Sequence, residues 1–273
     1  MPEFLTDPFF EKFRSLIYDS SGITFSDANR PILESRLRDR LRLAQLSEVG
    51  VYYDRILKDE GEMKTFLDSI TTNLTRFFRN QAHFDALERH VLPDLIQFKR
   101  SKGLEKKIRV WSAGCSTGEE PYTIAMILKD KLPADFSFDI TASDLSLKSL
   151  MAGSQGFYQA PKIQGIPDAY LERFFTKAGD GYQIKDDIKA RVKFDYHNLK
   201  FDSGLRNVDI IFCRNVLIYF DEAAQKNVID RFWTSLTNHA YLYIGHSESL
   251  FGMNTQFKFL KTEWSVLYTK LLD

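Results

Sequence analysis

A buried strand followed by a turn of small residues constrains the fold of this 273-residue chain more than any other feature. Residues 108–113 form a short apolar run, and the turn at residues 112–120 leads into a helical pattern over residues 121–131. Runs of this length are typical of strands that are buried on both faces of a sheet. Similar runs follow, with helical patterns between them, at residues 138–143, 208–213 and 240–245. Short buried strands that alternate with helices predict crossover units and a parallel sheet.

The chain on either side of these strands has a different pattern. Apolar residues at spacings of three and four predict helices over residues 9–18, 26–44, 48–58 and 60–71. We therefore expect a small all-helical domain over residues 1–72 and an α/β domain over residues 73–273. A hairpin of residues 257–261 and 264–270 would close the second domain. A short helix over residues 170–176, followed by loop and strand character over residues 179–196, indicates an insertion at about residues 172–196.

Composition and charge exclude several classes of protein. Lys and Arg together number 37, as do Asp and Glu, whereas a nucleic-acid-binding protein more often carries a basic excess. The two cysteines, Cys115 and Cys213, indicate neither a disulfide framework nor a zinc site, which favours a reducing compartment. No stretch approaches the roughly 20 apolar residues of a membrane span, and the N-terminal residues around Glu3 do not resemble a secretory signal. We expect a cytoplasmic protein with no metal, no nucleic-acid partner and no membrane insertion.

The turn at residues 112–120 is a candidate ligand site. Open parallel sheets bind ligands beyond the carboxyl ends of their strands, and Gly114 and Gly118 would let the backbone approach a ligand closely. The acidic pair Glu119 and Glu120 at the start of the helix disfavours a pyrophosphate. It suits a cationic ligand, such as the amino group and sulfonium of S-adenosylmethionine. The alternative is a tight turn whose acids only complement the helix dipole.

Polar residues in other segments would share this site. Asp144 ends the second strand, where a carboxylate could hold ribose hydroxyls, although it could equally cap the next helix. Arg214 and Asn215 end the third strand, and Tyr219 could reach over the cleft or lie in the core. Residues 71–79 lie at the junction of the two domains, a preferred location for ligands, and their arginines could also be solvated surface.

Together these segments resemble the CheR family, S-adenosylmethionine-dependent methyltransferases that esterify glutamates on bacterial chemoreceptors. The resemblance spans the chain through the strings at residues 71–79, 111–121, 212–221 and 246–248. It implies a small all-α N-terminal domain and a doubly wound, Rossmann-like methyltransferase domain that carries a small antiparallel β-subdomain. It also implies a product, glutamate 5-O-methyl ester, released with S-adenosylhomocysteine during chemotactic adaptation. We also expect a monomer.

The resemblance implies roles for particular residues. By motif position, the cofactor contacts would be Asn73, Thr75, Arg79, Ala113, Glu119, Asp144, Asn198, Leu199, Arg214 and Asn215. Arg79 and Tyr219 would be catalytic, lining the place where the substrate carboxylate docks. A glutamate, with a reference pKa of about 4.3, is already an anionic nucleophile at neutral pH, and the sulfonium is already activated. The enzyme therefore needs alignment more than a strong base, and the guanidinium of Arg79 could provide it through its fixed fork.

Two further features concern the protein substrate. Arg36, Arg38, Arg40 and Arg42 are concentrated on one predicted helix. Such a run is usually a solvated face, but in CheR-like enzymes this region faces the acidic methylation helices of the receptor. We therefore expect these arginines to steer docking. The stretch at residues 178–190 is shorter than the corresponding loop of enteric relatives, which grips a pentapeptide at the receptor C-terminus, so we expect no binding of that tether.

Two other functions compete with this interpretation. A nucleic-acid methyltransferase on the same fold usually has a Pro-Pro-Tyr/Phe string after the third strand, where this chain has Asn215-Val-Leu-Ile. A non-catalytic sensor of the cofactor would have no use for carboxylate positioning by Arg79 and Tyr219. Methyl transfer to receptor-containing membranes, with a base-labile product, distinguishes the three.

Overall fold

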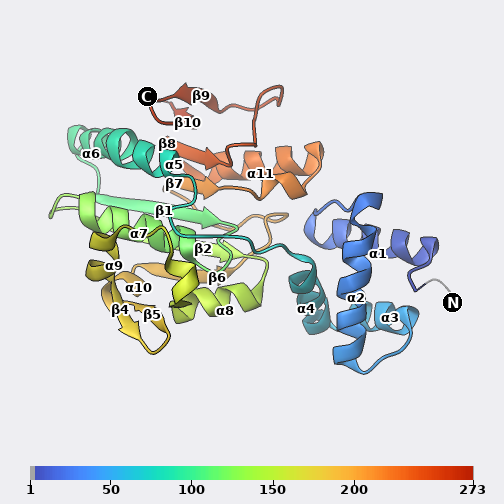
Figure 1. The fold of residues 1–273 in the computed structure, drawn as a ribbon. Coiled ribbons are helices and arrows are strands. Elements are labelled where there is room, and N and C mark those ends of the chain that lie inside the picture. Colours follow the sequence, from blue (N-terminus) through green and yellow to red (C-terminus); the bar gives the residue numbers. More distant parts are fainter. Residues whose placement is uncertain (1–3, 273) are drawn as a thin grey trace.

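A computed structural model describes residues 4–272. Met1–Glu3 and Asp273 lie outside the described residues. The start of the predicted helical domain, with its acidic Glu3, and the last residue of the predicted α/β domain are therefore not described. A group of helices lies beside a larger α/β unit, and the linker at residues 71–80 joins them (Figure 1). Across residues 4–272, no helix has both the length and the apolar character to span a membrane.

The helical domain forms around one apolar core. Its helices are α1 (Asp7–Ser21), α2 (Arg30–Ala44), α3 (Val49–Lys58) and α4 (Glu60–Ile70), close to the ranges predicted from periodicity. On α2 the buried residues Leu33, Leu37 and Leu41 recur every four positions, so they lie on one side of the helix. A 3-10 turn, Asp27–Asn29, precedes α2 and has a capping box between Ser26 and Asn29.

The α/β domain contains a sheet of seven strands among the described residues, in the order β6-β2-β1-β7-β8-β10-β9. The parallel strands are β1 (Lys107–Ala113), β2 (Ser137–Asp144), β6 (Val192–Tyr196), β7 (Val208–Cys213) and β8 (Leu236–Ile244). The C-terminal hairpin adds β9 (Lys258–Lys261) and β10 (Val266–Leu271), with β10 antiparallel to β8. The predicted parallel sheet and closing hairpin are therefore confirmed.

Helices cover both faces of this sheet. Successive strand residues point to opposite faces, so Val110 joins one core with Ile124, whereas Trp111 joins another with Phe232. The first core includes α5 (Gln81–Ala86), α6 (Leu92–Ser101) and α7 (Glu119–Lys131), and the second includes α11 (Glu222–Ser235). The doubly wound architecture is therefore confirmed. Helices α5 and α6, and the π-helical segment Leu87–Val91 between them, were not predicted from the sequence.

A separate antiparallel sheet has the strand order β3-β5-β4. Its strands are β3 (Phe157–Gln159), β4 (Phe175–Ala178) and β5 (Gly181–Ile184), with α9 (Asp168–Phe174) before β4 and α10 (Asp186–Lys189) after β5. The predicted insertion at about residues 172–196 differs from it at both ends. β3 has only three residues, too few for a periodic pattern, and β6 belongs to the main sheet, where it pairs with β2.

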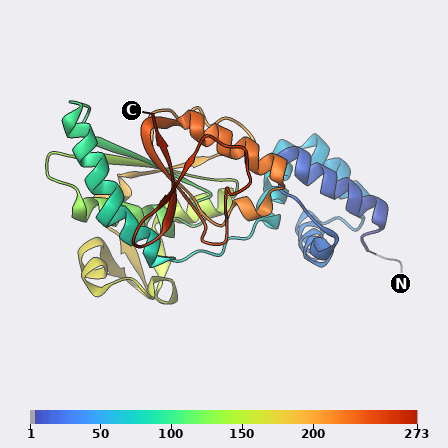
Figure 2. The same ribbon diagram turned by 90° about the horizontal axis from the view of Figure 1, so that it is seen from above.

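The helical domain lies at the carboxyl ends of the parallel strands (Figures 1 and 2). The turn after α1 makes an antiparallel bridge there, between Ile23 and Phe220. Next to it, the backbone N–H of Thr24 donates to the carbonyl of Tyr219 over 2.8 Å. The loop after β7 is therefore tied directly to the helical domain.

Candidate active site

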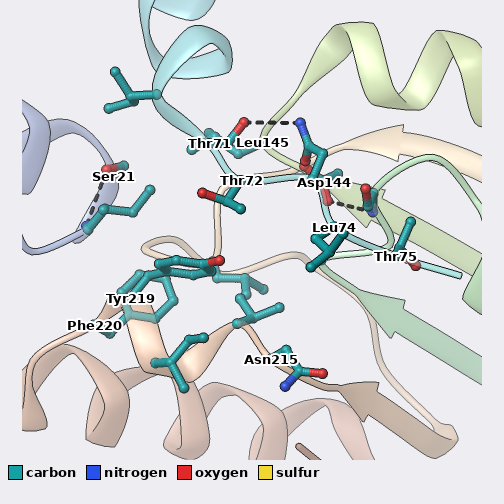
Figure 3. Close-up of a pocket in the computed structure, with 18 of the residues that line it drawn as sticks. Ser21, Thr71, Thr72, Leu74, Thr75, Asp144, Leu145, Asn215, Tyr219 and Phe220 are labelled. Atoms are coloured by element: carbon teal, nitrogen blue, oxygen red, sulfur yellow. Dashed lines mark hydrogen bonds between the residues drawn. The ribbon is translucent and has the colours of Figure 1, made fainter. Parts of the chain in front are cut away.

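A cavity of about 370 Å³ separates the helical domain from the carboxyl ends of β1, β2 and β7 (Figure 3). This volume lies within the range of roughly 300–1,000 Å³ that is usual for small-molecule sites. Its walls come from both domains and from the linker: residues 23–25, 70–75, 114–116, 144–145, 197–199, 214–216 and 218–220, with Ser21, Asn29, Ile32, Arg79 and Glu120. The cavity therefore lies where the polar strand ends were expected to meet.

Gly114 shapes the floor of the cavity. Its φ of +79° lies in the left-handed region, which favours glycine. A Cβ atom at this position would lie 2.4 Å from Cγ2 of Val216 in the loop after β7. Glycine thus allows two strand ends to approach each other at the base of the cavity.

The two adjacent glutamates of α7 point in different directions. Glu120 lines the cavity, where it accepts a hydrogen bond from Ser112 Oγ over 2.7 Å and forms a buried ion pair with Arg214 Nε, also at 2.7 Å. Glu119 is fully buried away from the cavity and accepts from Thr117 Oγ1 and Lys162 Nζ. Consecutive helix residues are about 100° apart around the axis, so only one of them faces the cavity.

Asp144 presents its carboxylate to the cavity from the end of β2 (Figure 3). The carboxylate accepts the backbone N–H groups of Ser116 and Ser146, over 2.8 and 2.9 Å. Burial raises the pKa of Asp144, and these hydrogen bonds oppose that shift. The N-cap of α8 (Leu147–Gln155) is Ser146, whose hydroxyl accepts from Ser149 N–H. A carboxylate has about four acceptor positions, so Asp144 has capacity left for ligand hydroxyls.

Two polar atoms in the cavity wall are buried without a hydrogen-bond partner in the described structure, Ser116 Oγ and His197 Nε2. Buried polar atoms in proteins nearly always have a partner, so these two fit a ligand that carries polar groups. Burial lowers the pKa of His197, which keeps the ring neutral at physiological pH. With Asp144, these atoms make a wall suited to the nucleoside part of S-adenosylmethionine.

Arg79 and Arg214 also line the cavity, and Arg214 connects them to His83 behind it. Arg214 donates from Nη1 to the carbonyl of Arg79 over 2.6 Å, and the same atom lies 3.3 Å from His83 Nδ1. Burial and the positive charge of Arg214 lower the pKa of His83 to about 3, so its ring is neutral and can accept this hydrogen bond. The side chain of Arg79 donates to the carbonyl of Leu74, and within residues 4–272 it forms no ion pair.

The structure brings most of the expected site residues to one cavity. Those that line it are Asn73, Thr75, Arg79, Asp144, Asn198, Leu199, Arg214, Asn215 and Tyr219. Ala113 and Glu119 do not line it, because Ala113 is packed in the core beneath the sheet and Glu119 points away. The amide of Asn198 is already engaged, donating from Nδ2 to the carbonyl of Ser20 and accepting from Lys200 N–H.

Glu248 holds the loop after β7 through contacts that could not be read from the sequence. Its carboxylate accepts the backbone N–H groups of Gly245, Asn215 and Ile218, over 2.5, 2.9 and 3.2 Å. A Cβ atom on Gly245 would lie 2.6 Å from Glu248 Oε2, so this approach requires glycine. The string at residues 246–248 was visible in the sequence, but its contact with residue 215 depends on the neighbouring positions of β7 and β8.

The arginines of α2 are not equivalent. Arg36, Arg38 and Arg42 are exposed, with Arg38 stacked 3.8 Å from the ring centroid of Phe4. Arg40 is turned inward and pairs with Glu62 at 2.5 Å. The expectation that Arg40 forms part of a docking surface is therefore corrected, because its guanidinium is committed to a largely buried contact between α2 and α4.

Neither cysteine is suited to act as a nucleophile at this site, although Cys115 lines the cavity. Cys115 and Cys213 are buried free thiols, and burial raises the pKa of each well above its usual value. A thiol that remains protonated is a poor nucleophile. In the part of the chain that the structure describes, no group of three or more His, Cys, Asp or Glu side chains is placed to hold a metal ion.

Comparison with known proteins agrees with this geometry. Residues 8–71 match the all-alpha domain of CheR methyltransferase, and residues 73–266 match its SAM-binding domain. Chemotaxis protein methyltransferase 2 of Vibrio cholerae is 32% identical over 274 residues, covering 97% of this chain and 94% of the relative. Chemotaxis protein methyltransferases of Borreliella burgdorferi (37% over 246 residues; 87% and 86%) and Escherichia coli (34% over 262 residues; 93% and 88%) are also similar. The chain therefore belongs to the CheR family of methyltransferases, and its cofactor is S-adenosylmethionine.

Proposed function

We propose that this enzyme methylates glutamate side chains of bacterial chemoreceptors, giving glutamate 5-O-methyl esters and S-adenosylhomocysteine during chemotactic adaptation. The observation that supports this most directly is the guanidinium of Arg79, which lines the cofactor cavity without an acidic partner among the described residues. An unpaired guanidinium beside a methyl donor suits an anionic acceptor. The names of the relatives, chemotaxis protein methyltransferases, support the biological context.

The proposed chemistry requires little from the protein beyond alignment. When bound, the cofactor supplies a methyl group that is already activated. A glutamate is ionised at neutral pH, since its reference pKa is about 4.3, so no general base is needed. Arg79 would hold the carboxylate through its planar fork, and the hydroxyl of Tyr219 would bind the second oxygen. Both residues line the same cavity, which agrees with this assignment.

The cofactor would lie along the walls already described. Asp144 would accept its ribose hydroxyls, and the unpartnered atoms of Ser116 and His197 would bind its remaining polar groups. The other cavity-lining candidates are Asn73, Thr75, Asn198, Leu199, Arg214 and Asn215. Ala113 and Glu119 would act from behind the wall, by shaping the turn.

Receptor docking is assigned to the N-terminal domain, residues 1–72, and catalysis to residues 73–273. Arg36, Arg38 and Arg42 are exposed and could attract an acidic receptor surface. The hairpin of β4 and β5 pairs Ala178 with Gly181, which leaves only a tight turn between them. That short turn supports our proposal that the enzyme does not bind the pentapeptide tether. We further propose that it acts as a cytoplasmic monomer.

The decisive experiment measures transfer of labelled methyl groups from S-adenosylmethionine to membranes that contain unmethylated chemoreceptors. We expect label on the receptors that is released by mild base, as a methyl ester requires. The Arg79→Gln variant should lose most of this activity, whereas Arg206→Gln, at an exposed arginine outside the cavity, should retain it. Base-stable label, or label only on added RNA or DNA, would contradict the proposal.

A further inference from the structure

The β-subdomain, which we define as residues 157–189 from β3 to the end of α10, contacts the linker between the two domains. Phe77 of this linker is 2% exposed. Its ring packs edge-to-face against Tyr158 of β3 and Phe175 of β4, with ring centroids 4.8 and 5.6 Å apart. Aromatic pairs in this geometry add to the stabilisation that burial provides. The end of the linker is therefore packed against two strands of the small antiparallel sheet.

The next linker residue, Phe78, is held in an uncommon backbone conformation. Its φ of +51° lies in the left-handed region, which is rare for a bulky residue. Its ring packs edge-to-face against Tyr170 of α9 at 5.5 Å, and its backbone N–H donates to Thr123 Oγ1 of α7 over 3.2 Å. Such a conformation persists only where surrounding contacts determine it. The direction in which the chain reaches Arg79 therefore depends on how Phe77 and Phe78 are packed.

The β-subdomain also contacts the turn after β1, which lines the cofactor cavity. Tyr158 is buried, and its hydroxyl donates to the carbonyl of Thr117 in this turn over 2.7 Å. A Cβ atom on Gly118 would lie 3.0 Å from the same hydroxyl. Ser116, which lines the cavity, directly precedes these two residues. Tyr158 thus touches the linker with its ring and the cofactor turn with its hydroxyl.

An ion pair makes a second connection between the β-subdomain and the cofactor turn. Glu119 is fully buried, and its Oε1 accepts from Lys162 Nζ over 3.2 Å. Lys162 belongs to the 3-10 turn Ala160–Ile163, which follows β3. Burying a carboxylate is costly unless it is paired, so Lys162 stabilises the start of α7 in its present position. Glu120, the next residue of α7, lines the cavity.

We propose that the β-subdomain is a positioning element of the methyltransferase, which holds the cofactor turn and the linker before Arg79 in the arrangement that catalysis needs. Tyr158 is its central positioning residue, because it contacts both segments. For the cofactor turn, this inference rests only on the family to which the chain belongs; for Arg79, it also rests on the proposed function. The β-subdomain then contributes to methyl transfer whether or not it binds any part of a receptor.

The first test replaces Tyr158 by Phe, which removes the hydroxyl and keeps the ring against Phe77. We expect calorimetric titration with S-adenosylhomocysteine to show about fivefold weaker binding, the equivalent of one neutral hydrogen bond. Tyr182→Phe is the matched control, because Tyr182 pairs with Tyr158 across the strands and its hydroxyl makes no hydrogen bond within residues 4–272. Native affinity in a folded Tyr158→Phe variant would overturn the inference, since a merely structural residue would change only the denaturant midpoint.

The second test removes the ion pair with Glu119. Lys162→Met keeps most of the aliphatic chain, and we expect about threefold weaker binding of S-adenosylhomocysteine, because the lysine is half-exposed and the pair is partly screened. Lys162→Arg retains a donor and should restore the affinity. Lys177→Met, at an exposed lysine of β4, is the matched control. Native affinity in Lys162→Met, or an equal loss in Lys177→Met, would argue against a specific connection through Glu119.

The third test concerns the linker and uses methyl transfer to receptor-containing membranes. Phe175→Leu removes a ring that packs against Phe77, and we expect kcat to fall about fivefold because Arg79 is held less firmly. Phe157→Leu is the matched control, since Phe157 is exposed and points to the opposite face from Tyr158. An unchanged kcat in Phe175→Leu would overturn the inference for the linker. Absence of methylation by the native enzyme would refute the proposed function, whereas the titrations would still decide whether the β-subdomain holds the cofactor turn.

Discussion

Replacing Glu248 tests whether the segment that carries Arg214, Asn215 and Tyr219 is held in place from outside the cavity. In the native structure Oε2 accepts from Gly245 and Asn215, and Oε1 accepts from Ile218. In Glu248→Gln, one oxygen can still accept from the first two groups, but the new NH2 group faces the N–H of Ile218. In Glu248→Ala, all three donors lose their acceptor, and only water can replace it.

The magnitude follows from these contacts. A hydrogen bond to a charged group contributes roughly 1.5–3 kcal/mol. Glu248→Gln loses the charge and the longest bond, which we take as about 1.5 kcal/mol, and Glu248→Ala loses about 3 kcal/mol because water compensates part of the total. We expect this free energy to destabilise the loop conformation that binds the cofactor. The affinity for S-adenosylhomocysteine then decreases about tenfold in Glu248→Gln and about a hundredfold in Glu248→Ala.

Calorimetric titration with S-adenosylhomocysteine measures the affinity, and denaturant midpoints show whether each variant remains folded. Glu263→Gln, at an exposed glutamate of the C-terminal hairpin, is the matched control and should behave as the native enzyme. A folded Glu248→Ala variant with native affinity would refute the reasoning. Equal losses in the Gln and Ala variants would show that the charge, rather than the number of bonds, holds the loop.

Four further outcomes follow from the site and its surroundings. Asp144→Asn should weaken S-adenosylhomocysteine binding by roughly tenfold, since one acceptor oxygen becomes a donor; native affinity in a titration would contradict this. Charge reversal of both Arg36 and Arg42 should raise the KM for receptor and leave cofactor affinity unchanged, and an effect on cofactor binding alone would argue against docking. Gly114→Ala should lower stability by about 2–4 kcal/mol in denaturant titrations, because it combines a positive φ with a contact of 2.4 Å, and a neutral effect would refute the steric argument. The pKa of His83 is lowered to about 3 in the folded protein, whereas it is about 6.5 in the unfolded chain. The unfolded chain therefore takes up the proton at higher pH, and the free energy of unfolding decreases as pH falls from about 6.5 toward 3. The difference between the denaturant midpoints at pH 7 and pH 5 should therefore become smaller in His83→Gln, and an unchanged difference would contradict the assignment.

The sheet and the position of the site could be predicted because both depend on local patterns. A strand buried on both faces is apolar along most of its length, as at residues 208–213, where Asp209 interrupts the apolar run. Polar side chains directly after such strands meet at one edge of the sheet. The edge strand β6 was not assigned to the main sheet because exposed residues alternate in it with buried or half-buried ones, and because its partner β2 is distant in sequence. The three residues of β3 are too few to show any period.

The choice between neighbouring side chains could not be predicted. Whether Glu119 or Glu120 faces the cavity depends on how α7 is rotated about its axis. Consecutive residues of a helix point about 100° apart, so a small error in this rotation exchanges the two side chains. Arg40 follows the same spacing as the exposed arginines of α2, and only the packing of α4 against that helix brings Glu62 to it. Glu248 likewise gains its partners from the pairing of β7 with β8, a contact between distant segments.

Because the cavity lies between the two domains, a bound cofactor would contact two structural units that have separate hydrophobic cores. Its walls include the turn after α1, which belongs to the core of the helical domain, and strand ends that belong to the cores of the α/β domain. A ligand that contacts both walls stabilises their assembled arrangement by RT ln(1 + [L]/Kd) relative to any arrangement in which the domains separate. Cofactor supply therefore affects how firmly the helical domain is held against the α/β domain.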